Sequence, residues 1–247
     1  MLVKQAVNTL QILEYFSERL KPATLAEIAD DLSWPRSSTF NIVGTLVEKG
    51  YLYQPHIRGA YYPSPRWLTL SQIINDAAPL PKGVLELLQN LATATKETVI
   101  IAAPSGINAI FLAVIESQYS VRYSAKVGDN VPIHASSAGR SLLSQMSREQ
   151  RTALYRKINF IQFSPNSPTT VEQVEEKLEL SAARGYHQSH AEYVRDLVGV
   201  AIPLNIPDRN LSIIVVGPIS RCLEERDKIA VIMKKEILKF KKGNLAR

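Results

Sequence analysis

Polar side chains suited to DNA recognition lie on one side of a predicted helix that precedes Gly50. They carry a guanidinium, hydroxyls and an amide, and they are Arg36, Ser37, Ser38, Asn41 and Thr45. A guanidinium can bind guanine or a phosphate, and an amide can make a paired contact to adenine in the major groove. Backbone amides at a helix N-terminus near Ser37 and Ser38 add phosphate binding without net charge. The pattern predicts a helix that reads duplex DNA.

The elements that must position this helix are predicted by the residues around it. Apolar residues at helical spacing predict a first helix that packs through Ala6, Leu10, Leu13 and Phe16. A second helix is predicted to open at Thr24, because Thr24 and Glu27 have the spacing of a capping box. The third helix is expected to lie on the first two through Ile42, Val43 and Leu46. Two helices joined by a short turn are typical of a helix-turn-helix.

A hairpin is predicted directly after the third helix. Two short strand-like runs flank residues 56–59, and His56 and Arg58 would lie at the tip, where they could touch the DNA backbone or minor groove. Together with the three helices, this hairpin predicts a winged helix-turn-helix, with Thr24, His56 and Arg58 as further candidate DNA contacts. A generic three-helix unit that binds other proteins is the alternative.

The rest of the chain has a different pattern. Residues 76–81 contain two prolines and form the best linker candidate. Beyond them, helical segments are expected near residues 84–91, 136–144, 149–157, 171–184 and 223–241, and strands at 98–103, 109–115, 121–127, 198–204 and 211–216. Strands that follow one another in pairs, with helices between them, predict an α+β fold with a largely antiparallel sheet.

Composition excludes several classes of protein. The chain of 247 residues has a single cysteine, so it has neither an intramolecular disulfide nor a zinc site made of several cysteines. No apolar run is long enough to span a membrane, and we expect a soluble cytoplasmic protein without a membrane partner. The net charge is +6, yet residues 1–75 hold seven basic and six acidic side chains, whereas residues 221–247 hold nine and four. The excess charge therefore does not locate a DNA-binding surface.

Motifs along nearly the whole chain resemble the IclR family of transcriptional regulators. In the first part they are Leu25-Ala26-Glu27-Ile28-Ala29, Pro35-Arg36-Ser37-Ser38 and Leu46-Val47-Glu48-Lys49-Gly50-Tyr51-Leu52. In the second part they are Glu97-Thr98-Val99, Gly128, Val131-Pro132-Ile133-His134-Ala135, Ala138-Gly139-Arg140, Arg184-Gly185-Tyr186, Val200-Ala201-Ile202-Pro203 and Gly217-Pro218. One departure is Phe40-Asn41, because relatives often carry an aromatic residue or His followed by Arg. The loss of that Arg would make DNA affinity depend more on Arg36 and the wing.

The resemblance implies a domain plan and a second binding site. The plan is a winged helix-turn-helix over residues 1–63, a linker helix over 64–80 and a GAF-like α/β effector-binding domain over 81–247. By motif, the effector site would be lined by Tyr123, Ser137, Ala138, Ser189, Gly199, Ile214 and Val216. Some relatives that sense small carboxylates carry Asp, Cys and Ser at matching positions. Because apolar groups replace these, we expect a larger, less polar organic effector, for which an aromatic acid is a candidate. A degenerate pocket that binds nothing is the alternative.

Other kinds of site are less well supported. His187, His190 and Glu192, with His134, could bind a metal, but strand alternation would put His187 and His190 on opposite faces. An enzyme that pairs Cys222 or Ser136 with His134 is a further alternative. The chain lacks the sequence motifs of hydrolases and of nucleotide-binding enzymes, so we expect no catalytic residues, no metal and no cofactor. The basic residues of the last helix follow acidic ones, an order that the helix dipole favours, and a second nucleic-acid site is the alternative.

The sequence therefore predicts a regulator that binds double-stranded operator DNA as a homodimer or a dimer of dimers and is controlled by a small organic effector. Two recognition helices that read two half-sites add their binding free energies, which is the physical reason to expect pairing. Repression is expected, with activation as an alternative, since the sign depends on where the operator lies. A module that binds ligands or proteins without binding DNA is the alternative from another class.

Overall fold

The structure is a computed structural model that describes residues 3–55, 59–77 and 80–245, with the side chains described as far as residue 243. Contacts divide the chain into two compact units, Met1–Pro79 and Leu80–Arg247. No helix among the described residues is long and apolar enough to cross a membrane.

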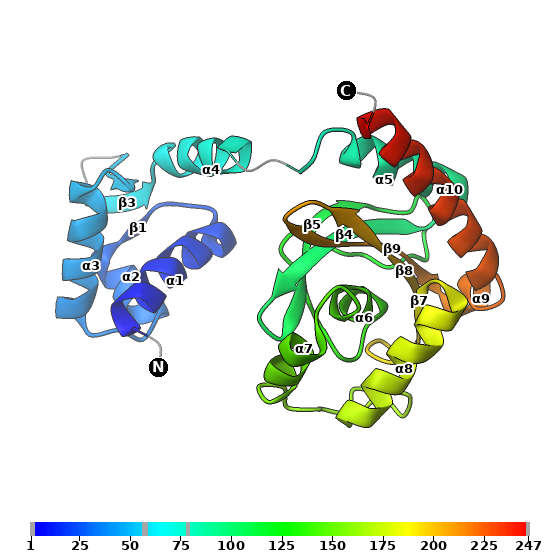
Figure 1. Ribbon diagram of the computed structural model, residues 1–247. Coiled ribbons are helices and arrows are strands. Elements are labelled where there is room, and N and C mark those ends of the chain that lie inside the picture. Colours follow the sequence, from blue (N-terminus) through cyan, green and yellow to red (C-terminus); the bar gives the residue numbers. More distant parts are fainter. Residues whose placement is uncertain (1–2, 56–58, 78–79, 246–247) are drawn as a thin grey trace. The chain divides into compact units, whose positions relative to one another are not determined.

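The N-terminal unit is a three-helix bundle with a small sheet and a following helix (Figure 1). Its helices are α1 (Lys4–Arg19), α2 (Leu25–Asp31), α3 (Arg36–Glu48) and α4 (Arg66–Ala77). Its strands are β1 (Ala23–Thr24), β2 (Leu52–Tyr53) and β3 (Ala60–Pro63), which pair antiparallel in the order β1-β3-β2. The expected helix-turn-helix followed by a hairpin is confirmed, whereas the two-residue strand β1 had no signal in the sequence.

The buried face of α1 is not the one that the sequence predicted. Leu10 is 59% exposed and Ala6 is exposed, while Ile12 and Phe16 are buried. Residues two apart on a helix point about 200° away from each other, so a core face through Ile12 necessarily turns Leu10 outward. The prediction was right for Phe16 and wrong for Ala6 and Leu10, because several apolar residues of α1 satisfy the helical spacing equally well.

The C-terminal unit is built on one antiparallel sheet of six strands in the order β6-β5-β4-β9-β8-β7 (Figure 1). The strands are β4 (Thr98–Ser105), β5 (Asn108–Ile115), β6 (Asn130–Pro132), β7 (His187–His190), β8 (Leu197–Ile206) and β9 (Arg209–Pro218). The helices are α5 (Val84–Thr95), α6 (Ser137–Leu143), α7 (Arg148–Tyr155), α8 (Val171–Arg184), α9 (Ile219–Cys222) and α10 (Arg226–Leu245). The α+β class with an antiparallel sheet is therefore confirmed.

Alternate residues of the central strands face opposite layers of the unit. Val99 and Ile101 pack with helices α5 and α10 on one face of the sheet. Ile100 and Ala102 face the other side, where they pack against α6. This period of two places each of these side chains in one of the two cores on either side of the sheet.

A predicted strand over residues 121–127 is absent; the segment has no regular structure. Its backbone finds partners other than a strand. The carbonyl of Val121 accepts from Arg221 Nη2 over 2.9 Å, and the carbonyl of Tyr123 accepts from Thr98 Oγ1 over 2.8 Å. Because side chains satisfy these two carbonyls, the segment can remain an irregular loop without pairing as a strand.

Candidate functional site

Helix α3 is held at a fixed angle to α2 by a short, well-bonded turn. Ser33 adopts a left-handed conformation with φ of 55°, and the backbone N–H of Trp34 donates to Ala29 O over 2.8 Å. Val43 and Leu46 on the inner side of α3 are buried in the core of the bundle, and Ile42 packs against it. The inner face is therefore occupied by packing, and the opposite face is free to bind a ligand.

The outer face of α3 carries the residues that the sequence singled out. Arg36, Ser37, Asn41 and Thr45 are exposed, and Ser38 is half-buried. The Arg36 side chain is 77% exposed and lies 3.9 Å from a carboxylate oxygen of Asp30, a contact that a phosphate could readily replace. The structure brings these five side chains onto one helix, so together they can present a cation, hydroxyls and an amide to a groove of DNA.

Thr24 has a structural role at the start of α2. Its hydroxyl accepts from the backbone N–H of Glu27 over 3.3 Å, and the Glu27 carboxylate accepts from the backbone N–H of Thr24 over 2.8 Å. The bond from the Thr24 N–H, a second one from the Thr24 hydroxyl over 2.9 Å and an ion pair to Arg19 over 2.5 Å lower the pKa of Glu27 to about 2. Thr24 is half-buried, so any contact that it makes with DNA is secondary to capping the helix. The predicted wing-tip residues His56 and Arg58 lie outside the described residues.

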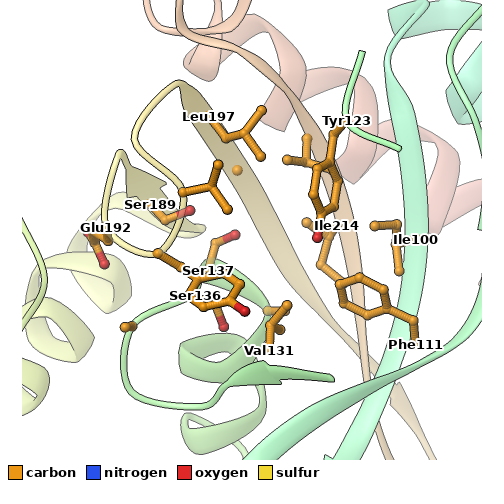
Figure 2. Close-up of a pocket in the computed structure, with 16 residues that line it drawn as sticks. Ile100, Phe111, Tyr123, Val131, Ser136, Ser137, Ser189, Glu192, Leu197 and Ile214 are labelled. Atoms are coloured by element: carbon orange, nitrogen blue, oxygen red, sulfur yellow. The ribbon is translucent and has the colours of Figure 1, made fainter. Parts of the chain in front are cut away.

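The C-terminal unit has a cavity between α6, the sheet and the irregular segment that carries Tyr123 (Figure 2). The structure brings all seven residues of the expected effector site to its wall: Tyr123, Ser137, Ala138, Ser189, Gly199, Ile214 and Val216. Nine more residues complete it: Ile100, Phe111, Val131, Ala135, Ser136, Glu192, Tyr193, Val194 and Leu197. The cavity has a volume of about 60 Å³, which suits a small ligand.

Most of the cavity wall is apolar or aromatic, and among the described residues no Lys or Arg lines it. Polar groups come from serines on α6 and β7, from the tyrosines and from the Glu192 carboxylate. Burial raises the pKa of the Tyr123 phenol, so this group is a hydrogen-bond donor as well as an acceptor at neutral pH. The site can therefore bind a ring or alkyl group and orient a few hydroxyl or carbonyl oxygens.

The Glu192 carboxylate is already paired with two cations behind the cavity wall. Its Oε2 accepts from Arg140 Nη1 over 2.6 Å, and its Oε1 lies 3.1 Å from Lys177 Nζ. Arg140 is fully buried on α6 and also donates to the backbone carbonyls of His134 and Gln188. These contacts tie α6, α8 and the segment after β7 together at one side of the cavity.

Gly199 lies where the cavity wall is tightest. A Cβ atom at this position would lie 2.4 Å from Ser137 Oγ and 2.9 Å from Ser189 Oγ. Because position 199 of β8 has no side chain, there is room for both serine hydroxyls at this point of the wall.

Sequence reasoning missed Ile100, Phe111 and Tyr193 as part of the cavity wall. Ile100 pairs with Ile214 across β4 and β9, and Phe111 pairs with Ala102 of β4 on the same side of the sheet. Directly paired residues share one face of a sheet, so strand pairing explains both positions. The sequence predicts Glu192 only as a possible metal ligand and not as part of the cavity wall. Tyr193 lies in the irregular segment after β7, where neither periodicity nor pairing predicts the direction of a side chain.

The structure does not support the alternative metal site or a cysteine nucleophile among the described residues. Within the described part of the chain, no group of three His, Cys, Asp or Glu side chains could hold a metal ion. His187 is buried and His190 is half-buried, as alternation along β7 requires. Burial and the Glu97 carboxylate raise the pKa of the Cys222 thiol to about 12, so this cysteine is a poor nucleophile.

Comparison with known proteins accounts for both units. Residues 5–56 match the family described as "IclR helix-turn-helix domain", and residues 76–239 match "Bacterial transcriptional regulator IclR C-terminal". The chain is 26% identical over 226 residues to the HTH-type transcriptional regulator KipR of Bacillus subtilis, covering 90% of this chain and 89% of KipR. It is 26% identical over 228 residues to the transcriptional repressor IclR of Escherichia coli, covering 91% and 83%.

Solved structures show the same fold. The IclR protein of Thermotoga maritima superimposes with a TM-score of 0.77 at 16% identity, over 95% of this chain and 96% of that one. An IclR homologue of Microbacterium hydrocarbonoxydans, complexed with 4-hydroxybenzoate, gives a TM-score of 0.69 at 20% identity, over 94% and 98%.

Proposed function

Because the chain belongs to the IclR family of bacterial transcriptional regulators, we propose that α3 binds operator DNA and that a small organic effector in the C-terminal cavity sets the operator affinity. The observation that carries the proposal is the division of α3 into two faces. Its inner side chains pack into the bundle, and its outer side chains offer Arg36, Ser37 and Asn41 to a partner. Those groups match the donors and acceptors at phosphates and base edges.

Pairing of two chains is part of the proposal. The outer face of α3 carries one guanidinium, and residues 1–75 have only one more basic than acidic side chain. A DNA-binding unit with so little positive charge gains little binding free energy from the release of counterions. Its affinity for the operator would therefore come from two half-sites that are bound at once. A homodimer or a dimer of dimers supplies two such readers. The chain would act in the cytoplasm, where it meets its operator, and we propose no catalytic role.

The cavity supports an effector of low polarity. Its rings and aliphatic side chains would bury an apolar body, while Ser137, Ser189 and the Tyr123 hydroxyl would orient a few polar atoms. A fully charged small carboxylate would lose its hydration without gaining a cation in return, since no Lys or Arg in the described part of the chain lines the cavity. The relative that was solved with 4-hydroxybenzoate shows that this fold can hold a hydroxylated ring. We therefore propose a hydroxylated aromatic compound or a weakly polar aromatic acid.

We propose repression as the outcome, because curated relatives such as IclR and AllR of Escherichia coli are named repressors. The effector would release the protein from DNA only if it binds more tightly to the DNA-free arrangement of the paired chains.

Selection of the full chain against random-sequence duplexes tests this function. We expect enrichment of one sequence with two-fold symmetry, and an effector that binds the cavity should lower the affinity for it. Enrichment of no sequence would favour a module that binds ligands or proteins without DNA. Binding that an effector strengthens would contradict the proposed release from DNA by the effector.

A further inference from the structure

Helix α3 exposes a large aromatic side chain between its polar groups. The chain has six phenylalanines, all of which the structure describes, and Phe40 alone among them is exposed, at 64%. Phe40 lies four residues after Arg36 and next to Asn41, on the face of α3 that points away from the bundle. An aromatic ring in water loses the free energy that its burial would provide, and no packing among the described residues of the N-terminal unit explains its position.

Gly44 leaves the helix surface beside Phe40 bare. Residues four apart are neighbours on a helix, so Arg36, Phe40 and Gly44 form one row along α3. A Cβ atom at Gly44 would meet nothing within 4 Å, and the residue does not have a positive φ. Glycine inside a helix costs stability relative to alanine, and here neither packing nor backbone conformation requires it. A partner that approaches the helix backbone closely would account for it.

The groups around Phe40 indicate the chemistry of that partner. Arg36 on the same row favours a polyanion, and Ser37 and Asn41 on the adjacent row offer hydrogen bonds to base edges. The apolar group that a major groove presents between such base edges is the C5-methyl of thymine. Resting on the proposed function, we infer that Phe40 packs on a thymine methyl group and that Gly44 lets the helix backbone approach the same base pair. Each operator half-site then requires a thymine beside the base that Asn41 reads.

Replacement of single thymines by deoxyuridine tests the inference, because this change removes only the methyl group. The operator is first isolated by selection with the full chain, and each thymine of a half-site is then replaced in turn. We expect one or two positions at which the wild-type chain loses about four-fold in affinity, the value for one buried methyl group. Phe40→Ala should bind the unmodified operator more weakly and be insensitive to uridine at those positions.

Two further variants make the test specific. Leu10→Ala removes another exposed apolar side chain of the same unit, 59% exposed on α1, and should keep the wild-type pattern of uridine sensitivity. Gly44→Ala fits without a clash and should raise helix stability, yet it should weaken operator binding by obstructing the close approach.

The outcomes separate this inference from the proposed function. A wild-type chain that binds every uridine operator equally well overturns it, as does a Phe40→Ala variant with unchanged uridine sensitivity. In both cases operator binding itself stands. Should Phe40→Ala fail to fold, an unchanged affinity of Gly44→Ala would overturn the close approach. A change in oligomeric state on Phe40→Ala, with the same uridine pattern, would show that a second chain covers the ring instead. Failure to select any operator would overturn the function and the inference together.

Discussion

The guanidinium of Arg140 donates to the carboxylate of Glu192 over 2.6 Å, and both side chains are buried, with Glu192 in the wall of the C-terminal cavity and Arg140 behind it. Arg140 belongs to α6 and Glu192 to the segment after β7, and Lys177 of α8 adds a second cation. A ligand in the cavity would therefore lie beside a charge cluster that joins three elements of the unit. In Figure 2 the Glu192 end of this cluster and the segment that carries Tyr123 lie on different sides of the cavity.

Loss of the charge on Glu192 should destabilise the C-terminal unit strongly. Glu192→Gln leaves the buried guanidinium of Arg140 without its counter-charge, and we expect a loss of about 3 kcal/mol in the free energy of unfolding. Urea denaturation followed by far-UV circular dichroism measures it. Glu225→Gln breaks an exposed pair with Lys228 and should change the same quantity by less than about 1 kcal/mol. Equal effects of the two changes would contradict a structural role for the buried pair.

The buried imidazole of His187 should make stability depend on pH. Burial, with Arg140 and Arg184 nearby, lowers its pKa to about 4, so the folded state keeps this group neutral where the unfolded chain binds a proton. As the pH falls from about 6.5 towards 4, the free energy of unfolding should fall by up to about 1.4 kcal/mol per unit. His187→Gln should reduce this slope between pH 7 and 5 to the part that His134 contributes, since burial lowers the pKa of that imidazole too, while His190→Gln should keep the full slope. A slope that His187→Gln leaves unchanged would assign it to other groups.

The capping box at Thr24 should stabilise the DNA-binding unit. Thr24→Ala removes the hydroxyl that accepts from Glu27 N, and we expect the unfolding free energy to fall by about 1 kcal/mol. Both tryptophans of the chain, Trp34 and Trp67, lie in this unit, so their fluorescence reports its unfolding. Ser17→Ala, at an exposed position of α1, should have little effect. A comparable loss in both variants would argue against capping as the cause.

A larger side chain at Leu197 should block the effector cavity. Leu197 is half-buried in the cavity wall, and tryptophan there would project into the space that Tyr123 and Ile214 border (Figure 2). A ligand at 100 times its dissociation constant should stabilise the wild-type chain by about 2.7 kcal/mol, and Leu197→Trp should abolish this gain. Thermal unfolding with 4-hydroxybenzoate and with its uncharged amide provides the probes. We expect the amide to bind at least as well as the acid.

Leu180→Trp is the matched control for that measurement, because Leu180 is 56% exposed on α8 and does not line the cavity. It should retain the full ligand-induced gain. A gain that also persists in Leu197→Trp would place the effector elsewhere.

The sequence predicted the elements of the fold where short-range rules decide them. Thr24 and Glu27 identify the start of α2 by their spacing, and Gly185, with a φ of 80°, ends α8 where the sequence predicted. The face of α1 could not be predicted, because the choice between Leu10 and Ile12 depends on which side meets α3. The segment around Tyr123 has the composition of a strand, and only distant partners such as Thr98 and Arg221 keep it irregular.

The residues of the cavity wall could likewise be predicted only in part. Motif resemblance identified Ser137, Ser189 and Gly199, because they lie on regular elements whose positions the family shares. Glu192 and Tyr193 lie on an irregular segment after β7. The direction of Glu192 depends on Arg140 and Lys177, and that of Tyr193 on its ring contact with Phe163, all of which are far away in the sequence. The exposed ring of Phe40 is likewise visible only once the buried face of α3 is known.

Operator binding by a variant that lacks the Arg36 and Asn41 side chains of α3 is the most direct test of DNA recognition by this helix. Arg36→Ala combined with Asn41→Ala should lower the affinity for the selected operator at least ten-fold, since each such contact contributes about 1–3 kcal/mol. Fluorescence anisotropy measures the affinity, and unchanged tryptophan fluorescence shows that the unit is folded. Arg156→Ala combined with Lys157→Ala removes two exposed positive charges from the other unit and should leave the affinity within about two-fold. An Arg36 and Asn41 double variant that binds the operator as tightly as the wild-type chain would contradict the assignment of α3 as the DNA reader.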